Sequence, residues 1–255
     1  MMRQALLVAA ALLTSAEAAR AERLTVALST PEVTINSNFT GTTVTVFGVI
    51  DRDAASLSGV GGYQVGVLLI GPPRTVVARR KERLFGIWAN AASETFEGAP
   101  SFYLFNTSAP AAEIAAPATL ERLQLGFDHI GFRTPEQATP DDPTFRDFRS
   151  AFIRLKERDA LYGESTGVEF IGNLIFRTTF RLPANVPVGA YTAEAYLFSD
   201  GSLIAREDEG LTVSKTGLEE TMSNFARNQG LIYGLICVVL GASIGWLGGV
   251  IFRRD

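Results

Sequence analysis

The chain of 255 residues is 47% hydrophobic and 20% charged, a composition typical of folded proteins and too apolar for a disordered chain. Its net charge of −4 argues against nucleic-acid binding, because neutralising phosphates requires a clustered basic surface. The single cysteine excludes an intramolecular disulfide, and the single histidine excludes any site that needs two imidazoles.

Residues 1–21 have the order of a secretory signal peptide. Arg3 gives a positive start, an apolar run follows from Ala5 to Leu13, and small residues surround the expected cleavage positions after Ala18 or Ala21. An N-terminal anchor helix is the alternative, but this apolar run spans only about 14 Å, under half of a bilayer core. The sequence therefore predicts an exported mature protein.

Between residues 22 and 213, short apolar strands alternate with turn signals such as Gly71-Pro72-Pro73. Strands are expected at 24–28, 42–50, 63–70, 75–84, 101–105, 168–171, 174–182, 191–198 and 203–213. One face of the segment 191–198 carries Tyr191, Ala193, Ala195 and Leu197. This pattern predicts a mainly β fold, an immunoglobulin-like β-sandwich.

The stretch 111–163 interrupts this pattern and predicts a helical insertion. Asp142 is a good N-cap, and Pro143 suits the first helical position. Apolar residues then recur at helical spacing, at Phe145, Phe148, Phe152 and Leu155. Gly163 is expected to end this helix, and a shorter helix is expected at 119–125. The insertion either packs on one sandwich or divides two, at about 24–110 and about 165–214.

The C-terminal end predicts one transmembrane helix at 230–252, after a juxtamembrane helix or bare linker at 214–229. The uncharged run is about 34 Å long at 1.5 Å per residue, enough to cross a hydrocarbon core of about 30 Å. A buried soluble helix is the alternative. Arg253 and Arg254, in the tail 253–255, place this end in the cytoplasm by the positive-inside rule. The sandwich is then expected on the opposite side of the membrane.

Small residues repeat along one face of the expected span, at Gly241, Gly245 and Gly249. Glycine at this spacing lets another helix approach closely, so we expect a helix-packing face here. Its partner is either another membrane protein or a second copy of the chain. The alternative is that glycine is simply common in membrane helices.

The sequence resembles a family of predicted alphaproteobacterial transmembrane proteins of about this length, over almost the whole mature chain. The matching segments are Gly71-Pro72-Pro73, Arg79 to Arg83, Gly86-Ile87-Trp88, Pro100 to Tyr103, Phe152 to Tyr162, Leu182 to Tyr191, Tyr233-Gly234, Gly245-Trp246 and Phe252-Arg253-Arg254. The resemblance implies a Gram-negative inner membrane with the domain in the periplasm. It assigns no activity and no site residue.

A dense charge cluster, Arg79 to Arg83, is the main candidate for a binding surface. On a strand, Arg79, Lys81 and Arg83 share one face, a basic stripe on a region that carries 19 basic and 25 acidic side chains between residues 22 and 229. Such a stripe suits docking of an anion or an acidic partner. The alternative is an edge strand charged against edge-to-edge pairing.

Other candidates have structural explanations. Trp88, Phe102 and Tyr103 suit a ligand groove or, more simply, core packing. His129 lacks a recognisable nucleophile motif nearby. The acidic pairs Asp51/Asp53 and Asp141/Asp142 lack the spacing of a calcium loop and suit turns and a helix cap. We therefore predict no catalytic residue, metal site or cofactor.

These features predict a non-enzymatic, single-pass protein of the bacterial inner membrane that contacts lipid, with its N-terminal domain in the periplasm. The expected role is an accessory or partner-binding subunit of a membrane complex, such as a transporter. One alternative is a periplasmic module that binds or senses a small ligand or anion. The other is a membrane-tethered enzyme built on carboxylate chemistry.

Overall fold

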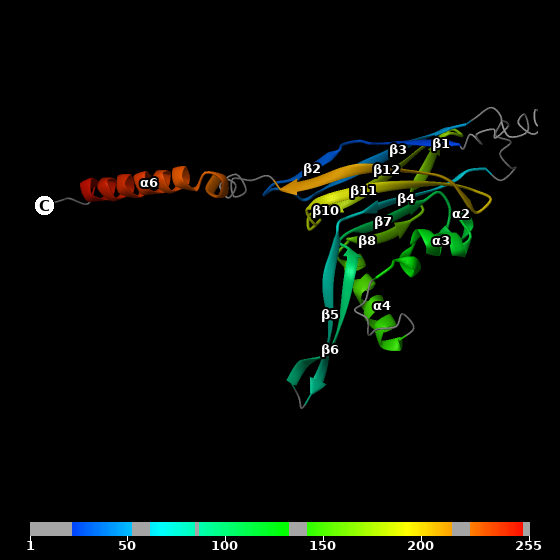
Figure 1. Ribbon diagram of the computed structural model, residues 1–255, viewed down its shortest axis with the longest axis horizontal. Coiled ribbons are helices and arrows are strands. Elements are labelled where there is room, and N and C mark those ends of the chain that lie inside the picture. Colours follow the sequence, from blue (N-terminus) through cyan, green and yellow to red (C-terminus); the bar gives the residue numbers. More distant parts are fainter. Residues whose placement is uncertain (1–21, 53–61, 85–86, 133–141, 216–224, 252–255) are drawn as a thin grey trace, which may run out of the picture.

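The computed structural model describes residues 22–52, 62–84, 87–132, 142–215 and 225–251. Its body is a sandwich of two sheets (Figure 1). The first sheet consists, in spatial order, of β1 (Arg23–Leu28), β3 (Gly41–Asp51), β10 (Ile175–Pro183) and β9 (Val168–Ile171). The second consists of β2 (Glu32–Ile35), β12 (Ser202–Lys215), β11 (Gly189–Ser199), β4 (Gln64–Ile70), β7 (Tyr103–Thr107) and β8 (Tyr162–Ser165). The chain is thus mainly β, as predicted.

Alternating apolar residues place the core between the two sheets. In β11, every second residue from Tyr191 to Leu197 is at most 2% exposed, which confirms the predicted buried face. One polar contact also crosses the core, where the Asn106 amide of β7 donates to the Thr178 hydroxyl of β10 at 2.8 Å. Because both groups are buried, this hydrogen bond satisfies atoms that would otherwise be costly to desolvate.

The helical stretch does not divide two sandwiches. In the first sheet β3 precedes this stretch and pairs with β10, which follows it. In the second sheet β4 and β11 pair in the same way. Strands from both sides of the helices therefore build both sheets of one sandwich.

Gly48 shows how closely the strands of the first sheet are fitted. It lies opposite Phe176 in the β3–β10 pair. A Cβ atom added at Gly48 would lie 2.0 Å from the ring of Phe176, which is fully buried. The aromatic ring therefore occupies the place of the missing side chain.

The described residues of the stretch predicted to be helical form four short or medium helices. They are α2 (Ala111–Ile114), α3 (Pro117–Leu123), the 3₁₀ turn η1 (Phe127–His129) and α4 (Pro143–Arg158). Asp142 caps α4 by accepting a hydrogen bond from the Thr144 backbone N–H at 2.8 Å, and Pro143 occupies the first turn, as predicted. Three predicted stripe residues are buried in α4, namely Phe145, Phe148 and Phe152.

Two details of the α4 prediction are wrong. Leu155 is 48% exposed, because it borders a groove that no described segment fills. Gly163 does not end the helix but lies in β8, where a Cβ would come within 2.9 Å of Leu104. Instead the helix ends at Arg158, and two residues later Ala160 takes a left-handed φ of 56° and donates its N–H to the Glu157 carbonyl.

A two-stranded arm, β5 (Pro73–Leu84) and β6 (Ile87–Pro100), leaves the sandwich and forms a sheet of its own (Figure 1). At about 3.3 Å per residue, β5 is about 40 Å long. The inner half of the arm packs on α4 through Phe96, whose ring centroid lies 5.2 Å from that of Phe152. β5 was predicted from the sequence, whereas β6 was not.

The last element, α6 (Gly230–Ile251), contains one apolar stretch long enough to span a membrane, Gly230–Gly249. None of that stretch is buried inside the protein, and Leu231 and Trp246 are 94% and 71% exposed. The hydroxyl of Ser243, its most polar side chain, donates to the Val239 carbonyl at 2.7 Å. A helix of this kind makes its backbone hydrogen bonds within itself and presents an apolar surface, as a bilayer requires.

Candidate functional site

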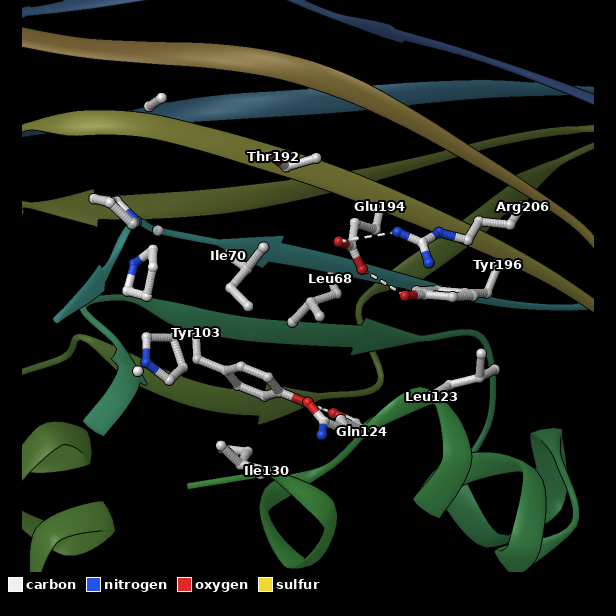
Figure 2. A pocket seen from close by; sticks show the side chains of 17 residues that line it. Leu68, Ile70, Tyr103, Leu123, Gln124, Ile130, Thr192, Glu194, Tyr196 and Arg206 are labelled. Carbon is white, nitrogen blue, oxygen red and sulfur yellow. Dashed lines mark hydrogen bonds and ion pairs between the residues drawn. The ribbon is translucent and has the colours of Figure 1, made fainter. Parts of the chain in front are cut away.

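A pocket of about 430 Å³ lies on the outer face of the second sheet, where the helices approach it (Figure 2). Its floor is formed by side chains of β4 and β11, such as Leu68, Ile70 and Thr192. Leu123 of α3 and Ile130 form the opposite wall. β4 carries apolar residues on both of its faces. One face packs on the first sheet, and the helices cover the other, where the floor of the pocket lies.

Charged residues gather at one end of this pocket. Arg206 lies directly opposite Tyr196 in the β11–β12 pair, and Asp208 lies directly opposite Glu194. The Arg206 guanidinium is 3.2 Å from the Glu194 carboxylate and 3.0 Å from the Asp208 carboxylate. Figure 2 shows the Glu194 carboxylate between Arg206 and Tyr196, whose hydroxyl donates to it. Arg206 therefore bridges two like charges that would repel each other across the strands.

Two members of this cluster, Tyr196 and Arg206, have a raised pKa. Burial, together with the hydrogen bond to Glu194, raises the pKa of Tyr196 above its ordinary value, so its hydroxyl stays a donor. The hydrogen bond to Asp208 raises the pKa of Arg206 and keeps it cationic. Two carboxylates and one guanidinium leave the cluster with an excess of negative charge. Chemically it offers hydrogen-bond acceptors to a polar or cationic group of a ligand.

Tyr103 joins the helical wall of the pocket to the sheet. Its hydroxyl accepts from the Gly126 N–H at 2.8 Å and donates to the Gln124 carbonyl at 3.1 Å. Burial raises the pKa of Tyr103, so the phenol remains able to donate. Tyr103 thereby positions the loop between α3 and η1 over the pocket.

Sequence reasoning did not find this cluster. Glu194 lies in the predicted strand 191–198, but Arg206 and Asp208 lie 12 and 14 residues further along the chain. Only the register of β11 on β12, which includes a bulge after Leu197, brings the four side chains together. A strand pattern contains no signal for that register.

The predicted basic residues lie on the arm. Arg79, Lys81 and Arg83 occupy alternating positions of β5 and are all exposed. Arg79 also borders a second cavity of about 380 Å³, a groove between β5 and α4. On the other face of β5, the Arg80 guanidinium lies 5.8 Å from the ring centroid of Phe148 in α4. The structure separates the basic residues from the pocket cluster, since none of the three lines that pocket.

The three predicted small residues of the span, Gly241, Gly245 and Gly249, lie in α6. A Cβ atom added to any of them would meet no atom of the protein within 4 Å. Within the described residues this face of the helix therefore packs against nothing.

The remaining candidates are placed as follows. Phe102 is fully buried against Tyr191, with ring centroids 5.6 Å apart, and acts as a core residue. Trp88 lies in β6, and its side chain falls outside the described residues. His129 is half-buried in η1. Among the described residues, no group of three or more His, Cys, Asp or Glu side chains is arranged to hold a metal ion.

The acidic pairs are only partly described. Asp51 is an exposed residue at the end of β3, and Asp142 is the cap of α4. Asp53 and Asp141 lie outside the described residues, as do the predicted signal peptide at 1–21, most of the juxtamembrane segment and the tail 253–255.

Comparison with known proteins agrees with the apolar helix. A search of curated proteins finds no relative of this chain. A family model described as "Putative transmembrane protein (Alph_Pro_TM)" matches residues 23–254, which include the sandwich, the arm and α6. The chain therefore belongs to this family of transmembrane proteins.

Proposed function

We propose that this protein is a non-enzymatic, single-span protein of the bacterial inner membrane whose periplasmic sandwich serves as a partner-binding subunit of a membrane complex. The arm carries this proposal. It extends beyond the sandwich, and its exposed basic residues Arg79, Lys81 and Arg83 stand out on an acidic exported region. A two-stranded ribbon gains little stability on its own, so an arm of this length is best explained by a partner that it contacts.

The membrane helix supplies a second contact in this proposal. Gly241 and Gly245 offer a flat surface with open space above it, which suits close packing of a partner helix. The predicted signal peptide and the arginines at 253–254 support an orientation with the sandwich in the periplasm.

Affinity purification of the tagged full chain from gently solubilised membranes tests the proposal. We expect a stoichiometric membrane protein to co-purify with the wild type. It should be lost from Gly241→Ile, Gly245→Ile and from a variant whose arm is shortened by replacing residues 81–91 with a two-residue turn. Ser243→Ile is the matched control, because at about 100° per residue it lies on the opposite side of α6. Recovery of the protein alone from the wild type would overturn the proposal.

A second candidate function is binding of a small ligand in the pocket beside Glu194. The observation that favours it is a cavity of about 430 Å³ that combines apolar side chains with polar groups converging at one end, a common form of ligand site. Native mass spectrometry of the protein purified from its own membranes would test it. A bound small molecule should be present in the wild type and absent from Glu194→Leu, and the same single mass in both would count against it.

A further inference from the structure

The groove between β5 and α4 runs along the edge of a strand. Five consecutive residues of β5, from Val76 to Arg80, border it. Because successive residues of a strand point to opposite faces, five in a row border a groove only when the strand edge faces it. The other edge of β5 pairs with β6, and no third strand joins this sheet among the described residues.

The opposite wall of the groove is one side of α4. Its residues recur at helical spacing and are Asp147, Phe148, Ala151, Phe152, Leu155, Lys156 and Asp159. Two apolar side chains are left half in solvent across the groove, Val77 on the strand at 49% exposure and Leu155 on the helix at 48%. A strand edge beside a helix that leaves an apolar side chain such as Leu155 in solvent is a setting in which proteins bind extended peptides by strand addition.

The two faces of β5 differ in chemistry. Val76 and Ala78 are half-buried and pack against the core on the face where Arg80 approaches α4. Arg79 and Lys81, on the other face, are exposed cations, and Arg83 continues this row. A strand added beside β5 would thus meet apolar side chains on one face and positive charges on the other.

We propose that the free edge of β5 pairs with an extended segment of a partner protein that alternates apolar and acidic residues. This inference rests on the proposed partner-binding function and names how the arm binds. The backbone of the segment hydrogen-bonds to β5, its apolar side chains cover the half-exposed Leu155, and its carboxylates face Arg79 and Lys81.

The basic residues of β5 favour an acidic segment over other strands that could pair with an open edge. A second copy of β5 would place Arg79, Lys81 and Arg83 beside residues of the same charge, which is destabilising for directly opposed pairs. An acidic segment turns the same repulsion into attraction. The basic row therefore blocks self-pairing and favours one class of partner, so protection of the edge and docking are two effects of the same residues.

Binding of a synthetic peptide to the full-length protein in detergent tests the pairing directly. The probe is a capped, fluorescent seven-residue peptide that alternates glutamate with valine, followed by fluorescence anisotropy. We expect saturable binding, at least tenfold weaker for the same peptide with lysine in place of glutamate. Equal binding of both peptides, or of neither, would overturn the proposal.

N-methylation of the peptide separates strand addition from side-chain contact. In an extended peptide the N–H groups of the valines and of the glutamates point to opposite edges. We expect methylation of one set to weaken binding at least tenfold and methylation of the other to change it less than threefold. If both methylated peptides bind as the parent does, no backbone pairing occurs and the inference fails.

Protein variants locate the site and separate this inference from the proposed function. Leu155→Glu should weaken binding of the acidic peptide at least tenfold. Ile171→Glu, at an equally exposed position on β9, should leave that binding unchanged. If the membrane partner stays bound to Leu155→Glu as to the wild type, docking uses another surface, so the inference fails and the proposed function stands. If no partner co-purifies with the wild type, the proposed function fails. The peptide assay then still tests whether the groove beside β5 binds an extended acidic segment.

Discussion

The sandwich and the arm are both built from strands with alternating residues, but the strands of the two regions are covered to different extents. In β10 of the sandwich, each of Phe176, Thr178, Phe180 and Leu182 is at most 2% exposed, because a second sheet covers that face. In β5 of the arm, α4 covers only the inner part, and Lys81 and Arg83 lie exposed beyond it. The inner face of each sheet is therefore covered by the other sheet, whereas the arm presents a surface that no described segment covers.

The largest expected effect concerns the base of the arm. Phe96 is fully buried, and its ring centroid lies 5.2 to 5.7 Å from those of Phe132, Phe145 and Phe152. Phe96→Ala should lower the free energy of unfolding by about 3–5 kcal/mol, the usual cost of emptying an aromatic core site. Urea unfolding of the detergent-solubilised protein, followed by circular dichroism, measures it.

Val77→Ala is the control for the base of the arm. Val77 belongs to the same hairpin but is 49% exposed, so its truncation should cost under about 1 kcal/mol. Equal losses from the two variants would mean that the arm is stabilised along its length and not from its base, and the comparison with the sandwich would fail.

A smaller effect is expected in the sandwich, at the contact between Gly48 and Phe176. A methyl group at Gly48 would overlap a ring that is enclosed on all sides, so Gly48→Ala should cost about 1–3 kcal/mol by overpacking. Gly210→Ala is the matched variant, since nothing lies within 4 Å of a Cβ atom added there. Its stability should be unchanged or slightly increased. Equal stability of both variants would show that the core accommodates the added methyl group.

The two regions also differ in how much the sequence predicts. The buried face of β11, the cap of α4 and three of its four stripe residues depend on residues close in sequence, and they were predicted correctly. The end of α4 was not, because the rule for helix termini expects glycine in the left-handed position. Here Ala160 takes that position, and the next residue, Leu161, donates to the Lys156 carbonyl at 2.9 Å to close the turn.

Contacts between segments that are distant in sequence could not be predicted from the sequence. The pairing of β3 with β10 joins residues more than 120 positions apart, and it decides that there is one sandwich. The pocket cluster likewise depends on strand register, as the pairing of Tyr196 with Arg206 illustrates. The basic row of β5 was visible in the sequence, but the edge that it borders was not, because that edge is defined by the position of α4.

The smallest expected effect on stability lies in the exposed row of the arm. Arg79→Thr, Lys81→Thr and Arg83→Thr together should change the free energy of unfolding by no more than about 1 kcal/mol, because exposed strand positions tolerate substitution and threonine favours strands. Retention of the membrane partner should nevertheless fall at least tenfold in co-purification, and binding of the acidic peptide should weaken by a similar factor. Loss of charge would thus remove binding and leave the fold intact.

A matched triple variant on the sandwich shows whether position or charge number matters. Arg23→Thr, Arg177→Thr and Arg181→Thr remove three exposed positive charges from strands of the first sheet, including the exposed ion pair of Arg177 with Glu169, which contributes little to stability. Both triples shift the net charge equally. If the partner were held only by general electrostatic attraction, its retention would therefore fall equally in the two variants. We expect the sandwich triple to retain the partner, because binding depends on cations aligned along a free strand edge. Equal losses from the two variants would mean that the arm contributes only its charge and that its strand edge plays no part in binding.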